Sequence, residues 1–257
     1  VIDFNNGPDL VELTNDNIRD AVQMWYTAEE EAVALYGFIE NWDVSGVTDM
    51  TCLFCGVQNH YESLEDWEPE IAPQDLSGWD VSNVTSMAYA FSGSYYFDLN
   101  AEDWDVSNVT DLAGAFFGVR SMETDITAWD VSSVERMHQM FENVNGFNQD
   151  ISSWDVSNVW DFAKMFINTP FDQDLSSWDV SHGENFSYMF GGVFGLSPEN
   201  GCAIDQAFSS NPYWTSIQEA IGGPEWNGFS CGSASVVGEC SLFANGPNAT
   251  WTHVITL

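Results

Sequence analysis

The chain has 257 residues, and 40 acidic residues against four basic ones give it a formal net charge of −36. This charge repels nucleic acid and anionic membranes, which excludes both as favourable partners, and it favours a salty, cation-rich extracellular setting. An apolar fraction of 44% and an aromatic fraction of 15% exclude disorder and supply the side chains of a large core.

Residues 1–37 are not repetitive and are predicted to form an N-terminal helical cap. Thr14 is suited to begin a helix that continues through Val22 and Trp25, because apolar residues recur there at helical spacing. A capping-box pattern that starts at Thr27 opens a second helical stretch. Since the first repeat of a stack exposes an apolar end, an amphipathic helix is the usual lid over it.

Residues 38–195 are organised by the tetrad Trp-Asp-Val-Ser, which recurs at a nearly constant interval of about 25 residues, typical of a repeat solenoid. The first interval is longer than the others, and its excess near residues 56–70 is predicted to be an insertion. Insertions in solenoids form loops on one face, which is often the binding face. The six tetrads begin at Trp42, Trp79, Trp104, Trp129, Trp154 and Trp178.

Each repeat changes its apolar period after the tetrad. In the fifth repeat, Ile151, Trp154 and Val156 follow a strand pattern with inward-facing side chains. Further along, apolar residues recur three and four apart up to Phe166, which predicts a short helix. The predicted fold class is therefore a leucine-rich-repeat-like solenoid with a short strand and a short helix in each repeat of about 25 residues.

Residues 196–257 break the repeat and are predicted to be either a C-terminal cap or an assembly segment. The stretch from Pro212 to Ile221 has the pattern of a short helix ended by glycine. The last nine residues are rich in threonine and favour a strand.

Residues 147–159 read Phe-Asn-Gln-Asp-Ile-Ser-Ser-Trp-Asp-Val-Ser-Asn-Val, followed by a run that ends in Met165 and Phe166. They resemble the repeat of the BspA-like leucine-rich-repeat surface proteins, specifically the mycoplasma-type lipoprotein repeat of unknown function. The resemblance covers roughly residues 36–192. It implies a solenoid, a secreted or cell-surface location and, more loosely, an adhesion or matrix role, and it supplies no catalytic residues.

An aspartate follows the tryptophan in every repeat, so stacking brings six carboxylates into one row. Strands about 4.8 Å apart place neighbouring carboxylates close enough to repel by about 1 kcal/mol in water. In a structural interpretation the serine two residues later, or a backbone N–H, compensates each charge. In a functional one the row is a weak divalent-cation site that binds Ca²⁺ through oxygen ligands. The row comprises Asp43, Asp80, Asp105, Asp130, Asp155 and Asp179.

A second, weaker acidic row lies four residues before the tryptophan and is interrupted by Asn100. It comprises Asp75, Asp125, Asp150 and Asp174. Neither row has the spacing of an EF-hand loop, so any cation sites are expected to be weak.

The five cysteines are disulfide candidates in an oxidising compartment, because their spacing does not fit a zinc ribbon. The odd number leaves one free thiol or one intermolecular bond. The cysteines are Cys52, Cys55, Cys202, Cys231 and Cys240.

Four Asn-x-Ser/Thr sequons are glycosylation candidates if the source is a glycosylating eukaryote. Asn248 lies outside the repeats and is the better candidate. The repeat's own consensus explains the other three, which are Asn83, Asn108 and Asn185.

No constellation of residues supports an enzyme. Residues 228–232 fit the letters G-x-S-x-G, but no helical pattern follows as a nucleophile elbow requires. The four histidines are scattered without metal-ligand spacing. No run of 18 apolar residues is present, so no membrane-spanning helix is expected. The chain begins at Val1, which predicts a removed signal peptide or a fragment of a longer protein.

The sequence predicts a non-enzymatic, secreted or cell-surface structural protein that acts as a self-assembling or partner-binding scaffold, such as a matrix, appendage or filament subunit. Its partners are proteins, either copies of itself or other surface proteins, bound through the solenoid face, the insertion or the C-terminal segment. The alternative is an extracellular binding module for a glycan, mineral or ice surface. No cofactor is required, and Ca²⁺ is the one ligand that the acidic rows suggest.

Overall fold

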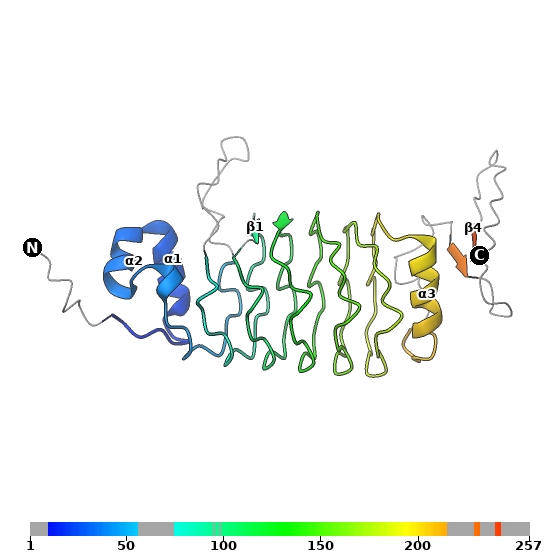
Figure 1. The fold of residues 1–257 in the computed structure, drawn as a ribbon, viewed down its shortest axis with the longest axis horizontal. Coiled ribbons are helices and arrows are strands. Elements are labelled where there is room, and N and C mark those ends of the chain that lie inside the picture. The colour runs from blue at the N-terminus through cyan, green and yellow to red at the C-terminus, as the bar shows by residue number, and fades with distance from the viewer. Residues whose placement is uncertain are drawn as a thin grey trace, which may run out of the picture.

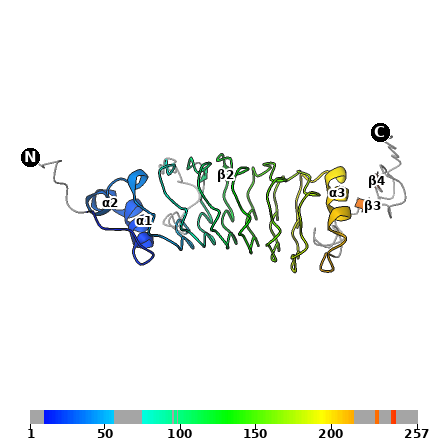
Figure 2. The same cartoon turned by 60° about the horizontal axis from the view of Figure 1, so that its bottom comes forward.

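The computed structural model describes residues 10–55, 75–94, 96–97, 99–214, 229–231 and 240–242. The repeats wind into turns of chain that lie side by side, each called a coil here and each beginning at a tetrad tryptophan (Figure 1). Parallel backbone bridges join each coil to the next at equivalent positions, from Asp49–Ser86 to Asp161–Asn185. Figure 2 shows the same row of coils from another direction, so the described part is elongated along the stacking axis.

Two helices, α1 (Ile18–Thr27) and α2 (Glu29–Tyr36), cover the first coil. The buried face of α1 includes Trp25, whose ring packs edge-on against Trp42 with centroids 6.1 Å apart. The helix begins later than Thr14, because the Thr14 carbonyl accepts the first hydrogen bonds and a turn precedes Ile18. A single-turn 3-10 helix, η1 (Ile39–Asn41), leads into the first tryptophan.

The local conformation of the coils differs from the strand and helix that the sequence predicts. Among the described residues, adjacent coils meet at isolated bridges, and only β1 (Tyr96–Phe97) and β2 (Ser121–Met122) form a two-residue parallel pair. Consecutive turns replace the expected short helix, because the tenth residue after each tryptophan has φ between 56° and 60°. Such a left-handed residue ends right-handed helical winding. These residues are Cys52, Tyr89, Gly114, Gln139, Lys164 and Tyr188.

Backbone hydrogen bonds in these turns alternate between two directions. The Cys52 N–H donates to the Ala88 carbonyl of the next coil over 2.8 Å. The following N–H, that of Leu53, donates back to Met50 in its own coil over 3.1 Å. The same alternation continues to the last coil. Buried backbone groups must be paired, and this pattern pairs them without a regular sheet or helix.

Two columns of aromatic rings run through the core of the stack. The tetrad tryptophans form the first column, in which Trp79 and Trp104 are stacked with centroids 6.4 Å apart. A phenylalanine twelve residues after each tryptophan forms the second, with neighbouring centroids 5.4 to 5.9 Å apart. The second column comprises Phe54, Phe91, Phe116, Phe141, Phe166 and Phe190. Offset stacking of buried rings adds to the free energy of area burial, so each coil stabilises its neighbours.

Helix α3 (Pro198–Phe208) covers the other end of the stack. Its N-cap is Ser197, whose hydroxyl accepts a hydrogen bond from the Asn200 N–H over 3.4 Å. Its last residue, Phe208, packs against Phe186 of the final coil and against Trp214. The described start of the predicted C-terminal cap or assembly segment therefore lies on the last coil.

Two further strands, β3 (Phe229–Cys231) and β4 (Cys240–Leu242), form an antiparallel pair. The predicted 56–70 insertion, most of the expected helix at 212–221 and the expected terminal strand lie outside the described residues. Among the helices of the described residues, none is long and apolar enough to cross a bilayer.

Candidate functional site

The aspartates that follow the tetrad tryptophans are exposed, and each has a local partner. In every repeat the carboxylate accepts a hydrogen bond from the backbone N–H of the serine two residues later, over 3.0 to 3.1 Å. The serine hydroxyl also donates, over 2.6 Å, to Asp43, Asp80 and Asp105. This is the local partner that the structural interpretation of the row requires.

These hydrogen bonds lower the pKa of several carboxyls in the row. Bonds from the serine hydroxyl and then from its backbone N–H hold the pKa of Asp43, Asp105 and Asp155 below the ordinary value. For Asp155, the neighbouring charge of Asp179 opposes this lowering of the pKa. These three carboxyls therefore favour the ionised form despite repulsion along the row.

The second acidic row has the same local geometry. Each of its carboxylates accepts a hydrogen bond from the backbone N–H two residues later, over 2.9 to 3.1 Å. At Asp125, the Thr127 hydroxyl adds a second bond of 2.7 Å, and both bonds lower the pKa of the carboxyl. In the described part of the chain, no three His, Cys, Asp or Glu side chains form a group that could hold a metal ion.

A third polar row was missed by the sequence reasoning. It occupies the seventh position after each tryptophan, where the parallel bridges join the coils. Its side chains bond from coil to coil: Arg136 pairs with Asp111 over 2.9 Å, and the Asn185 amide donates to Asp161 over 2.9 Å. Aligning the six repeats position by position would have found it, because every residue there is polar. The row comprises Asp49, Ser86, Asp111, Arg136, Asp161 and Asn185.

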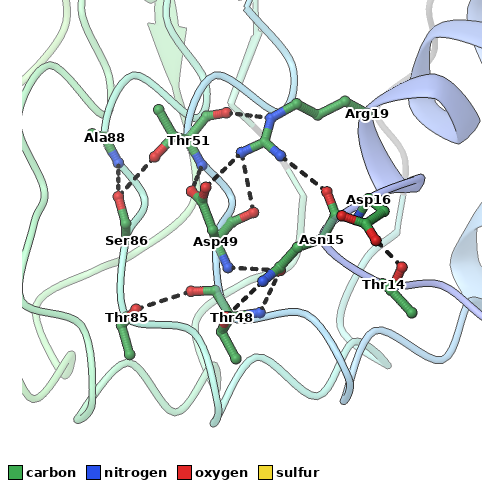
Figure 3. A network of polar contacts seen from close by, with 10 residues as sticks. All are labelled: Thr14, Asn15, Asp16, Arg19, Thr48, Asp49, Thr51, Thr85, Ser86 and Ala88. Carbon is green, nitrogen blue, oxygen red and sulfur yellow. Dashed lines mark hydrogen bonds and ion pairs between the residues drawn. The ribbon is translucent and has the colours of Figure 1, made fainter.

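At its N-terminal end, the third row connects to the helical cap. Figure 3 shows the Arg19 guanidinium of α1 reaching Asp49 and Thr51 of the first coil. Its Nη2 lies 3.1 Å from the Asp49 carboxylate, and its Nε donates to the Thr51 carbonyl over 2.9 Å. Partial burial raises the pKa of Asp49, but hydrogen bonds from Thr51 and the charge of Arg19 outweigh it, so the net pKa is lowered. The cap and the first coil are thus joined by charge as well as by packing.

In the middle of the stack, a polar cluster spans four coils. The Tyr89 hydroxyl donates to Gln139 over 3.0 Å and lies 3.4 Å from Nε2 of His138. On its other side, the His138 Nδ1 lies 3.4 Å from the Asp161 carboxylate. The Tyr89 ring crosses the intervening coil over Gly114, where a Cβ would lie only 2.2 Å from a ring carbon.

This cluster joins an imidazole, a phenol and a carboxylate, and burial raises the pKa of Tyr89. Its contacts run between coils, so its evident effect is to hold the fourth coil to its neighbours. The other histidines do not join it: His182 bonds to the Ser157 carbonyl, and His60 and His253 lie outside the described residues.

The structure pairs some of the predicted cysteines. Cys52 and Cys55 form a disulfide with their Cα atoms 4.8 Å apart, and Cys202 of α3 is also disulfide-bonded. Cys231 and Cys240 are backbone partners across the β3–β4 pair.

Three of the four sequons lie in the described repeats. The exposed amides of Asn83 and Asn108 each donate to a serine carbonyl of the preceding coil, over 3.0 and 2.8 Å. Asn185 is half-buried, and its amide nitrogen points to Asp161. Asn248 lies outside the described residues.

Comparison with known proteins matches the sequence to one protein family. Residues 19–72, 68–170 and 110–199 match the family described as Mycoplasma protein of unknown function, DUF285. No curated protein and no solved structure matches the sequence. Since the overlapping matches run from residue 19 to residue 199, well over half of the sequence, the chain belongs to this mycoplasma-type repeat family of unknown function.

Proposed function

We propose that the chain is a leucine-rich-repeat-type solenoid of the BspA-like kind and serves as a secreted or cell-surface structural scaffold without catalysis. It assembles with copies of itself or with other surface proteins, as a subunit of a matrix, appendage or filament. The faces available for this are the coil surfaces, the 56–70 insertion and the C-terminal segment.

The observation that carries this proposal is the unbroken contact between coils. The phenylalanine column runs from Phe54 to Phe190 without a gap, and backbone bonds join every pair of adjacent coils. Such a stack couples each coil to its neighbours and so resists bending, which suits a scaffold.

The use of the polar side chains supports the same proposal. Asp43 and its equivalents bond to their own serines, and Arg19 and Arg136 bond to neighbouring segments. Side chains that carry out chemistry on a ligand need free donors or acceptors aimed at a common point. Here the polar contacts of Asp43, Arg19 and Arg136 are directed at the chain itself.

Sizing with light scattering, followed by negative-stain imaging, tests self-assembly over a range of protein and salt concentrations. Low salt keeps molecules with a charge of −36 apart, so oligomers or filaments are expected at high salt, where the charge is screened. A chain that stays monomeric at high concentration and high salt contradicts self-assembly.

The second candidate function is a binding module for a glycan, mineral or ice surface, dependent on calcium where the acidic row is used. It is favoured by the regular orientation that the serine bonds impose on the Asp43-type carboxylates. Millimolar calcium then raises the melting temperature more than sodium at matched ionic strength. The Asp105→Asn variant reduces this shift, whereas Asp103→Asn, an exposed aspartate outside the row, does not. Equal shifts with the two salts contradict calcium binding.

A further inference from the structure

Asn145 and Gly146 form the tip of an exposed turn in the fourth coil. The Phe147 N–H donates to the Val144 carbonyl over 3.3 Å, so these two residues occupy the middle of the turn. Within the described residues, neither the Asn145 amide nor the Gly146 N–H has a hydrogen-bond partner, and nothing lies within 4 Å of where a Gly146 Cβ would be. The backbone nitrogen of Gly146 is therefore open to solvent and close to the Asn145 side chain.

We propose that Asn145 is a site of spontaneous deamidation. The Gly146 backbone nitrogen gives its proton to solvent and attacks Cγ of Asn145, and the new C–N bond closes a succinimide ring. The side-chain amide nitrogen takes a proton from solvent and leaves as ammonia. Water then opens the ring at either carbonyl, which yields aspartate or isoaspartate at position 145. Water is the only co-reactant, and no atom changes its oxidation state.

A second Asn-Gly pair, Asn200–Gly201, provides an internal comparison. It lies in the first turn of α3, where the Gly201 N–H donates to the Ser197 carbonyl over 2.9 Å and Gly201 is buried. The Asn200 amide donates to the Asp172 carboxylate over 2.8 Å. Ring closure there must first break both bonds by local unfolding. The other three Asn-Gly pairs, which begin at Asn6, Asn227 and Asn245, lie outside the described residues.

Deamidation at this turn has a structural consequence. Isoaspartate inserts one methylene group into the backbone before Gly146. The next residue, Phe147, is 1% exposed and stacked on Phe141 with centroids 3.7 Å apart, so a longer turn disturbs a packed ring. Both products also add a carboxylate to a chain that already carries a charge of −36. Conversion therefore destabilises the fourth coil.

Peptide mapping after incubation of the folded chain in warm, mildly alkaline buffer tests the proposal. Cleavage at Arg136 and Lys164 isolates residues 137–164, in which fragmentation locates the modified asparagine and distinguishes aspartate from isoaspartate. A glutamate-specific protease isolates residues 200–219. Conversion at Asn145 is expected to exceed that at Asn200 by about tenfold or more while the chain is folded, and the two rates converge in urea. If Asn145 keeps its amide in the folded chain while it converts in urea, the proposal is wrong.

Two variants and one enzyme make the test specific. Gly146→Ala introduces a Cβ into open space, so the fold is retained, but it crowds the attacking nitrogen and slows conversion at Asn145 several-fold. Asn145→Gln abolishes it. A protein isoaspartyl methyltransferase with S-adenosylmethionine as methyl donor should label position 145 in the 137–164 peptide of the aged chain, label it several-fold less in Gly146→Ala, and not label that position in Asn145→Gln. Equal labelling of Gly146→Ala and the unmodified sequence contradicts attack by the glycine nitrogen.

Discussion

At the scale of single residues, the tenth position after each tetrad tryptophan determines the path of its coil. Five of the six residues there are not glycine, although their φ angles are positive. L-residues in this region carry a conformational cost, which hydrogen bonds to the next coil offset in every coil that has one after it. Gly114 is the exception, and it is also where the Tyr89 ring crosses the backbone. Glycine is thus needed at position 114 for space, because the other coils hold non-glycine residues in the same conformation.

Substituting Gly114 by alanine is expected to lower the free energy of unfolding by about 2–4 kcal/mol. The loss has two causes, because alanine is strained at a left-handed φ and its Cβ displaces the Tyr89 ring. Gly93→Ala is the matched control, because Gly93 also has positive φ but nothing lies within 4 Å of a Cβ there. Urea unfolding of both variants separates the steric part from the conformational part. Equal losses in the two variants contradict a specific role for the ring contact.

The Asp105 carboxyl provides a test of pH dependence. Its folded-state pKa is lowered by Ser107, so the associated stability is present above the unfolded pKa of about 3.9 and is lost as pH falls through the folded pKa. Ser107→Ala should raise the pKa of Asp105 in an NMR titration and cost at most about 1 kcal/mol near pH 7 at this exposed site. The cost should vanish in acid. Ser153→Ala, at an exposed serine that makes no hydrogen bond to an aspartate of the described residues, should change neither quantity.

At the scale of elements, the tryptophan column joins coils through its indole N–H groups as well as through its rings. The Trp104 Nε1 donates over 3.0 Å to the carbonyl of Leu76, three residues before the tryptophan of the preceding coil. Trp79, Trp129 and Trp178 make the equivalent bond. The buried Nε1 of Trp154 has no hydrogen-bond partner in the described residues. Tryptophan therefore contributes an indole N–H hydrogen bond at this position, which phenylalanine cannot donate.

This difference predicts unequal effects of the same substitution. Trp104→Phe loses ring volume and removes one of the two hydrogen bonds that the Leu76 carbonyl accepts, the other coming from the Trp79 backbone N–H, at an expected cost of about 2–4 kcal/mol in unfolding free energy. Trp154→Phe loses the same volume but no hydrogen bond, and it should cost about 1 kcal/mol less. Chemical denaturation of the two variants measures the difference. A larger loss at Trp154 would refute the role assigned to the indole bond.

At the scale of the whole molecule, repulsion between acidic side chains opposes the packing that holds the coils together. The acidic rows run from coil to coil along the stack. Arg19 and Arg136 do not neutralise them, because these arginines pair with Asp49 and Asp111 of the third polar row. Self-repulsion from a net charge of −36 therefore destabilises the folded chain, and the effect falls as the Debye length shortens.

The melting temperature should accordingly rise between low salt and about 1 M NaCl, because screening weakens the repulsion more than it weakens two local ion pairs. Calorimetry or circular dichroism over a series of NaCl concentrations measures the change. Repeating the series near pH 4, where part of the charge is neutralised, should give a smaller rise. A melting temperature that falls with added salt contradicts the dominance of repulsion.

The sequence by itself determined the period of the chain and the inward position of its tryptophans and valines, which are buried as the alternation predicted. Both follow from local order, because apolar spacing along the chain dictates which side chains face the core. It did not reveal the turns that replace the helix, since a left-handed residue such as Gln139 donates its N–H to the adjacent coil, a contact that local sequence does not specify. The bond of Arg19 to Asp49 and the passage of Tyr89 over Gly114 likewise depend on which coil lies beside which. These contacts join residues 24 or more positions apart, so only the stacked tertiary structure brings them together.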